Sequence, residues 1–415
     1  MDMVQTATDK SYDMNKNPIQ IVYDEDKAAL HSKDNLTNIG ADDAEGITAL
    51  MALATNKNYN HGPLRMLFTY DEETTMQGAI EVSPQAINAD YLVNVDSGPV
   101  GAACVSSAGV IKIKLTKQFQ AAAPSLNTQL DVLIDGLTGG HSGVDIHKDR
   151  LNANIMCAQI LKKLSDEGID YQIAKLDGGW AMNIISTACH FVLYVDSANL
   201  DKVQEIIDNE FEAIRAGHTE DKDGHISMST KGPKVQNALC TLDSKTLVDL
   251  LLKIPHGLKE MNQKYPDTPA VSSNFGLLYL ENGKLSLVDF ARSDRDSCSD
   301  EFLENFKQLK NEYSAEIETL SRYSAWELSD DTRIVDLFKD SFKKTSNIDA
   351  VSYVSHGGLE CSRFLEKNPN LKMLSVGMDV ADEHMVTETL YTKSIPAFYA
   401  SMIYFLENAN VLLQN

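Results

Sequence analysis

The chain has no apolar run approaching the roughly 20 residues that cross a bilayer, and it has no excess of positive charge. Its 415 residues contain 60 Asp and Glu against 37 Lys and Arg, so the net charge is −23. Such an acidic chain repels phosphate backbones and anionic lipids, which argues against nucleic acid or a membrane as a partner. The first ten residues also lack the basic and apolar regions of a signal peptide, so we expect a cytoplasmic protein.

Cysteine is scarce, with six residues spread over the chain and no Cys-x-x-C pair. This spacing argues against a cysteine zinc site and favours free thiols over a disulfide framework. The sequence also contains no internal repeat and no low-complexity linker. Hydrophobic residues make up 43% and charged residues 23%, as in folded globular proteins, and the length suits roughly two or three domains.

Helix-like and strand-like stretches alternate over the first hundred residues. Residues 46–55 follow several acidic residues, which favour a helix N-terminus, so we expect a helix there. Residues 65–70 and 91–95 are short apolar runs of the length of buried strands. This alternation predicts an α/β fold with a mostly parallel sheet and helices on both faces.

The pattern changes after residue 108. Residues 110–115 and 129–134 alternate in side-chain character as half-exposed antiparallel strands do. Further along, residues 274–280 and 284–290 flank the step Asn282-Gly283, which is a strong hairpin signal. Mixed with helix-like stretches at 151–164 and 200–216, these strands predict an α+β domain.

The first pattern returns near the C-terminus. Residues 332–345 and 395–407 are helix-like, and residues 372–376 form a short apolar run. We therefore predict a discontinuous catalytic domain, made of residues 1–108 and 323–415, with a second domain inserted at 109–322.

Carboxylates and one imidazole follow the expected strands or open the expected helix. They are Asp42-Asp43, Asp71-Glu72-Glu73, Asp96 and Asp382-Glu383-His384. Each group alone is typical of a helix cap or a solvated face. Together they are expected at the carboxyl ends of parallel strands, where ligands bind in open α/β sheets. Carboxylates so close together repel one another unless cations lie between them, and this ligand set suits zinc, manganese or cobalt.

Several segments in one order along the chain resemble a known family. They are IGADDAEGITALMAL, HGPLRMLFTYDEETTMQGA, YLVNVDS, GLTGGHSGVDIH, FARS, SHGGLEC and SVGMDVADEH. In these motifs the chain resembles the cytosolic non-specific dipeptidases of the aminoacyl-histidine dipeptidase type, which are di-zinc metallopeptidases. The resemblance implies a zinc-peptidase catalytic domain with an inserted lid domain. It also implies hydrolysis of unblocked dipeptides, Xaa-His among them, by a water activated by two divalent metal ions. Zinc is the expected metal, with cobalt or manganese as alternatives, and the expected assembly is a homodimer.

The resemblance also implies roles for residues of the catalytic domain. Asp42 would bridge the two metal ions. Asp96 would belong to one metal, whereas Glu73 and His384 would hold the other. Glu72 would be the general base, which takes a proton from the attacking water and passes it to the leaving amine.

Four further residues resemble substrate-binding positions of the family. His141 would reach toward the developing oxyanion, and Asn183 and Arg292 would hold the substrate, with Arg292 suited to a dipeptide carboxylate. Gly358 would contact the substrate through its backbone. The residues alone also permit plainer interpretations: a turn histidine between glycines for His141, a surface charge on a strand for Arg292 and a tight loop for Gly358.

The chain departs from the family pattern at its first residues. The family carries a histidine ligand, one residue, and then a catalytic aspartate that orients the imidazole; Asp2 matches this aspartate, and the histidine would fall before Met1. One metal would then keep only Asp42 and Asp96, so we expect a poorly soluble or nearly inactive chain. Smaller departures are Met182, where relatives tend to have arginine, and Met385-Val386, where they have Ser-Pro.

Two alternative functions stay open. An aminoacylase or tripeptidase of the same superfamily would use the same metal ligands with different substrate contacts. A catalytically inactive binding protein is the other alternative, and it rests on the missing histidine.

Overall fold

The computed structural model describes residues 3–9 and 11–413. The chain divides into two units, of which unit 1 comprises Met1–Ser107 with Trp326–Asn415 and unit 2 comprises Ala108–Ala325. The sequence-based boundaries lay at 108/109 and 322/323.

A four-stranded sheet forms the centre of unit 1. Its order is β16 (Val351–Ser355), β4 (Ala102–Ser107), β17 (Lys372–Ser375) and β3 (Tyr91–Asn94). The pairs β16/β4 and β17/β3 are parallel, and β17 meets β4 in an antiparallel contact. Because β3 and β17 are parallel, their carboxyl ends lie at the same edge of the sheet, and the loop after β3 begins at that edge.

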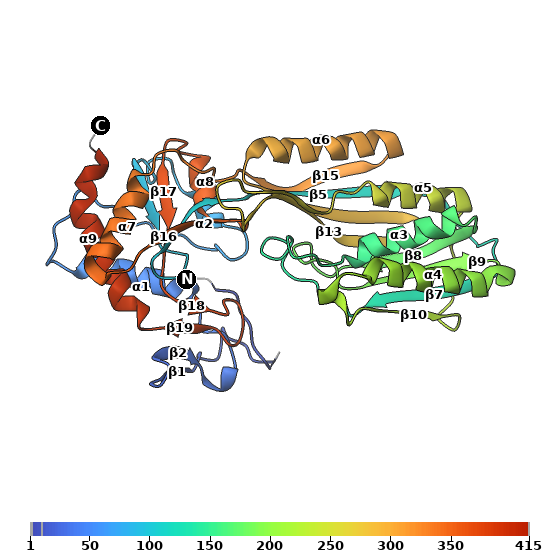
Figure 1. The fold of residues 1–415 in the computed structure, drawn as a ribbon, viewed down its shortest axis with the longest axis horizontal. Coiled ribbons are helices and arrows are strands. Elements are labelled where there is room, and N and C mark those ends of the chain that lie inside the picture. The colour runs from blue at the N-terminus through green and yellow to red at the C-terminus, as the bar shows by residue number, and fades with distance from the viewer. Residues whose placement is uncertain (1–2, 10, 414–415) are drawn as a thin grey trace. The chain divides into compact units, whose positions relative to one another are not determined.

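Helices cover both sides of this sheet (Figure 1). Helices α7 (Arg333–Ser346) and α9 (Ser394–Asn408) pack together on one side through buried phenylalanines. Helices α2 (Gln77–Glu81) and α8 (Cys361–Leu365) lie on the other side, where they share an apolar cluster with β4 and β17.

A small antiparallel sheet completes unit 1. It consists of β1 (Ile21–Asp24), β2 (Ala29–Ser32), β19 (Thr389–Tyr391) and β18 (Val380–Ala381). The short 3-10 helix η1 (Lys33–Asn35) follows β2 and precedes the long helix α1 (Ala41–Thr55). Because β2 pairs with β19, the segment leading into α1 lies beside the loop between β18 and β19.

The predicted strand at residues 65–70 is wrong. The structure shows no strand there, and Phe68 and Tyr70 are half exposed. An apolar run becomes a strand only when a neighbouring strand completes its hydrogen-bond ladder, and no described strand pairs with this segment. The composition of residues 65–70 does not show whether a neighbouring strand is available to pair with them.

Unit 2 is built on an antiparallel sheet, nine-stranded in the described residues. In order across the sheet, the strands are β10 (His225–Ser229), β7 (Thr128–Asp135), β9 (Cys189–Val195), β8 (Tyr171–Gly178), β13 (Pro269–Glu281), β14 (Lys284–Ser293), β5 (Gly109–Gln118) and β15 (Glu316–Tyr323). Strand β12 (Gly257–Met261) pairs with β13. Two short strands, β6 (Ala121–Ala122) and β11 (Ala238–Leu239), pair separately.

The predicted hairpin of unit 2 is confirmed. Strands β13 and β14 pair up to Glu281 and Lys284, so Asn282 and Gly283 form the turn. Both turn residues have positive φ, 50° and 78°, the conformation that tight hairpin turns require.

One face of this sheet carries the main core of unit 2. The helices that contribute to it are α3 (Ala153–Asp166), α4 (Leu200–Arg215), α5 (Thr241–Leu252) and α6 (Asp296–Tyr313). Alternate residues of the strands point into this core, as the pleat of a β-strand requires. No helix in the described residues of either unit is long and apolar enough to cross a membrane.

Candidate functional site

Loops of unit 1 carry the predicted metal ligands. Asp42 lies in the first turn of α1, directly after Gly40 and Ala41. Glu73 lies in the turn that follows residues 65–70, and Asp96 lies two residues beyond β3. His384 belongs to the loop between β18 and β19. Four segments far apart in the sequence thus contribute to this region of unit 1.

The side chains of Asp42, Glu73 and His384 meet. His384 Nε2 lies 3.1 Å from Asp42 Oδ2 and 3.0 Å from Glu73 Oε2. One ligand atom from each residue lies within 4.8 Å of the others, so the three side chains together could hold a metal ion. Two carboxylates and one imidazole suit zinc and the neighbouring divalent ions.

Electrostatics also fit a divalent cation here. Burial and the nearby carboxylates Asp43, Asp42 and Glu72 raise the pKa of Asp96 well above its usual range. Burial and Glu45 raise the pKa of Asp43 to about 9. Burial is the largest cause of both shifts, repulsion between the carboxylates adds to it, and a cation relieves that repulsion.

The cluster includes two more of the predicted residues. Asp96 is hydrogen-bonded to Asp42. Glu72 lies close enough to Asp96 to raise the pKa of that carboxyl. The structure therefore brings together Asp42, Glu72, Glu73, Asp96 and His384.

Gly358 lies in the loop between β16 and α8. Two residues later in this loop, Glu360 contributes to the raised pKa of Asp43. The loop therefore runs beside the acidic cluster. Asp2 lies outside the described residues.

The sequence analysis missed two buried acidic residues of this region. Glu45 accepts a hydrogen bond from the Met378 N–H at 3.1 Å, and burial together with Asp42 and Glu383 raises its pKa to about 7. Glu388 is fully buried and accepts hydrogen bonds from the backbone ahead of Asp42. Their only sequence signal is an acidic residue three or four positions after a predicted ligand.

The predicted substrate residues His141 and Asn183 lie together in unit 2. The Ser142 N–H donates to the Asn183 carbonyl at 2.9 Å, and His141 forms a β-bridge with Ile184. The backbone N–H groups of Gly143 and Val144 both point at His141 Nδ1, each at 3.3 Å. In the neutral ring Nδ1 is therefore the acceptor, and the proton lies on Nε2.

Arg292 lies against the same loop. It is on β14 and only 4% exposed, so it is not the surface charge that the sequence allowed. Its guanidinium carbon lies 4.3 Å from the Phe290 ring centre and would be 3.3 Å from a side-chain carbon placed on Gly143. Burial lowers its pKa. The backbone of Met182 lies against Gly276.

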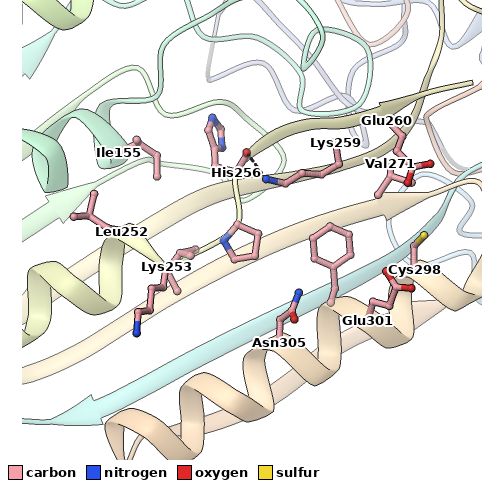
Figure 2. Close-up of a pocket in the computed structure, with 13 residues that line it drawn as sticks. Ile155, Leu252, Lys253, His256, Lys259, Glu260, Val271, Cys298, Glu301 and Asn305 are labelled. Carbon is pink, nitrogen blue, oxygen red and sulfur yellow. Dashed lines mark hydrogen bonds between the residues drawn. The ribbon is translucent and has the colours of Figure 1, made fainter.

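A separate hollow of about 600 Å³ in unit 2 contains none of the predicted site residues. Figure 2 shows it between α6 and the segment that joins α5 to β12, with Asn305 on one wall and His256 on the other. The Lys259 ammonium at this hollow donates to the His256 carbonyl at 3.1 Å. Glu260 pairs with Arg295, and Lys253 pairs with Glu312.

Comparisons with known proteins agree with this arrangement. The pattern of "Peptidase family M20/M25/M40" matches residues 21–408. The cytosol non-specific dipeptidase of Escherichia coli (strain K12) is 25% identical over 410 residues, which cover 98% of this chain and 83% of the relative. Peptidase T of Halothermothrix orenii is 37% identical over 91 residues, 21% of this chain and 22% of the relative.

The fold is similar to a solved dipeptidase structure. The aminoacylhistidine dipeptidase from Vibrio alginolyticus superposes with a TM-score of 0.85 at 26% identity, over 98% of this chain and 82% of that chain. The predicted fold class and the predicted assignment to the metal-dependent peptide hydrolases are therefore confirmed. The chain belongs to peptidase family M20/M25/M40.

Proposed function

We propose that the protein hydrolyses unblocked dipeptides with the help of divalent metal ions held in unit 1. The observation that carries this proposal is the convergence of Asp42, Glu73 and His384, whose ligand atoms lie within 4.8 Å of one another. The names of the two full-length relatives, both dipeptidases, support the substrate class.

In the proposed site, Asp42, Glu73 and His384 would hold one metal ion, and Asp42 with Asp96 would hold a second. We propose zinc for both, with cobalt or manganese able to replace it. The bound ions would lower the pKa of the attacking water and polarise the scissile carbonyl.

The protein's own side chains then handle protons and position the substrate. Glu72 accepts a proton from the attacking water and returns it to the leaving amine. His141 presents its Nε2–H to the substrate carbonyl oxygen, because its Nδ1 is occupied by two backbone donors. Arg292 and Asn183 hold the substrate, Arg292 through the C-terminal carboxylate, and Gly358 contributes its backbone.

A direct assay tests this function. Purified protein is incubated with Ala-His, Gly-Gly, a tripeptide and an N-acetyl amino acid, first with a chelator and then with added Zn²⁺. We expect dipeptide cleavage that is slow, because one metal would keep only Asp42 and Asp96, and that the chelator abolishes and Zn²⁺ restores. Cleavage of the N-acetyl amino acid or the tripeptide in preference to dipeptides would contradict the proposal in favour of an aminoacylase or tripeptidase. Metal binding without turnover of any substrate would instead indicate a binding protein.

The proposal extends to location and assembly. A cytoplasmic location accords with the name of the Escherichia coli relative and with cysteines that are all free thiols. We also propose a homodimer, which light scattering on the eluted protein tests. A mass of one chain at assay concentration would contradict it.

A further inference from the structure

The Glu388 carboxylate lies at the beginning of α1, although Glu388 belongs to the loop before β19. Its side chain is 1% exposed. Oε2 accepts hydrogen bonds from the N–H groups of Ile39 and Gly40, each at 2.7 Å, and Oε1 accepts one from Asp42 at 3.2 Å. Three backbone donors therefore converge on one carboxylate.

These contacts hold the backbone that carries Asp42. The first N–H groups of a helix have no partner within the helix, and a carboxylate both satisfies them and interacts favourably with the helix dipole. Gly40 has a positive φ of 67°, and a side-chain carbon there would lie 2.9 Å from Met3 Sδ. With Gly40 and Asp42 both bound to Glu388, the direction of the Asp42 side chain is set.

The same loop holds His384. The Glu388 N–H donates to the Met385 carbonyl at 3.0 Å, and the His384 carbonyl accepts from Thr6 Oγ1 at 2.8 Å. Directly after Glu388, Thr389 pairs with His31 of β2. The loop before β19 thus supplies both the His384 imidazole and the Glu388 carboxylate, and Glu388 in turn holds the backbone of Asp42.

We propose that Glu388 is a positioning residue that sets the geometry of Asp42 and His384 before a metal ion binds. This inference rests on the proposed function, because it concerns the proposed metal site. Glu388 accepts hydrogen bonds from the backbone of Ile39, Gly40 and Asp42 and does not belong to the candidate ligand group Asp42, Glu73 and His384. Its effect on metal affinity therefore passes through Asp42 and His384.

Two substitutions of Glu388 test separately its capacity to accept hydrogen bonds and the length of its side chain. Glu388→Gln keeps the length of the side chain but replaces one oxygen by an NH₂ group, which cannot accept from a backbone N–H. Glu388→Asp keeps the charge but is one methylene shorter, so its carboxylate cannot reach all three donors. Asn368→Ala is the matched control, because Asn368 Nδ2 donates to the backbone carbonyls of Ile87 at 3.0 Å and Ala89 at 3.1 Å.

The experiment measures the Zn²⁺ dissociation constant of the metal-free protein by competition with a chromophoric chelator. We expect Glu388→Gln to weaken Zn²⁺ binding about tenfold or more, as loss of groups that orient metal ligands does. Glu388→Asp should lie between Glu388→Gln and the unsubstituted protein, and Asn368→Ala should stay within about twofold. Co²⁺ binding gives a second readout, since a changed absorption spectrum reports altered ligand geometry. Equal Zn²⁺ affinity and an unchanged Co²⁺ spectrum in Glu388→Gln would overturn the inference.

A measurement on the unsubstituted protein decides the question even when the variants do not fold. Hydrogen exchange at the amides of Ile39 and Gly40 should be slow without metal, because their protons are already bound to Glu388. Rapid exchange there would overturn the inference. Failure of the unsubstituted protein to bind Zn²⁺ would overturn the proposed function and this inference together. Tight Zn²⁺ binding that is unaffected by Glu388→Gln would overturn this inference alone.

Discussion

His384 Nε2 lies 3.1 Å from Asp42 Oδ2, although 342 residues separate the two in sequence. Hydrogen bonds that His384 makes to the Asp42 and Glu73 carboxylates raise its pKa to about 10. The contact joins the start of α1 to the loop between β18 and β19 and brings together two predicted metal ligands that are far apart in the sequence. Substitutions of the residues at and beside this contact can test which side chains bind metal and which transfer protons.

Glu72 and Glu73 are neighbours in sequence with different expected roles. Glu72→Gln should lower kcat on dipeptides by roughly 10²–10⁴-fold with bound metal unchanged, because only the proton acceptor is lost. Glu73→Gln should lower the metal content together with activity, since Glu73 Oε2 lies 3.0 Å from His384 Nε2. Steady-state kinetics with metal analysis checks both. Normal turnover by Glu72→Gln would exclude Glu72 as the base.

The described residues offer unequal ligand sets for two metal ions. Asp42, Glu73 and His384 form the fuller set, whereas Asp42 and Asp96 provide carboxylates alone. We therefore expect Zn²⁺ to bind in a tight and a weak phase during calorimetric titration.

Two variants assign these phases. Asp96→Asn should remove the weak phase and leave the tight one, whereas His384→Ala should weaken the tight phase about tenfold or more. Two phases of equal affinity, or loss of the tight phase in Asp96→Asn, would contradict the assignment.

The raised pKa of the buried Asp289 leads us to expect that the stability of unit 2 depends on pH. Burial raises its pKa from 3.8 to about 8, against opposing effects of a hydrogen bond from Ser273 and the charge of Lys259. Between these values the folded chain keeps a proton that the unfolded chain has lost. The free energy of unfolding therefore falls as pH rises, by up to about 1.4 kcal/mol per pH unit, and levels off above pH 8.

Asp289→Asn carries an uncharged side chain of the same shape and should make this slope shallower, while the raised pKa values of Asp43 and Glu45 keep a slope of the same sign in the metal-free protein. Urea unfolding of the metal-free protein between pH 4 and pH 8 measures it. Asp208→Asn, at an exposed position of α4, should leave the slope as it is. Parallel pH profiles for Asp289→Asn and the unsubstituted protein would refute the prediction.

The sequence predicted local structure correctly where the conformation depends only on residues next to each other in the chain. The Asn282-Gly283 step predicted its hairpin because both turn residues need positive φ, which these residue types adopt readily. Motif resemblance also pointed to Asp42, Glu73 and His384, and the structure brings their ligand atoms together.

The sequence did not predict structure or burial correctly where they depend on contacts with residues far away in the chain. Residues 65–70 have the composition of a strand, but a strand also needs a neighbouring strand. Glu388 binds backbone N–H groups 346 to 349 residues away, and backbone groups leave no trace in side-chain patterns. The residues alone left Arg292 open between a substrate contact and a surface charge, because burial cannot be inferred from one position on a strand; the side chain is buried.

The segment at residues 65–70 predicts how the protein associates with itself. Around it, Leu64 is 42%, Phe68 50% and Tyr70 51% exposed, although the composition is that of a buried strand. Adjacent exposed apolar side chains without a ladder partner favour aggregation. Phe68→Ser should therefore reduce the concentration-dependent light scattering of the purified protein at least about twofold. Leu242→Ser, at a 73% exposed position on α5 that lies apart from this segment in the sequence, is the control and should change the scattering less. Equal effects of the two substitutions would show that general surface hydrophobicity, and not the unpaired segment, drives association.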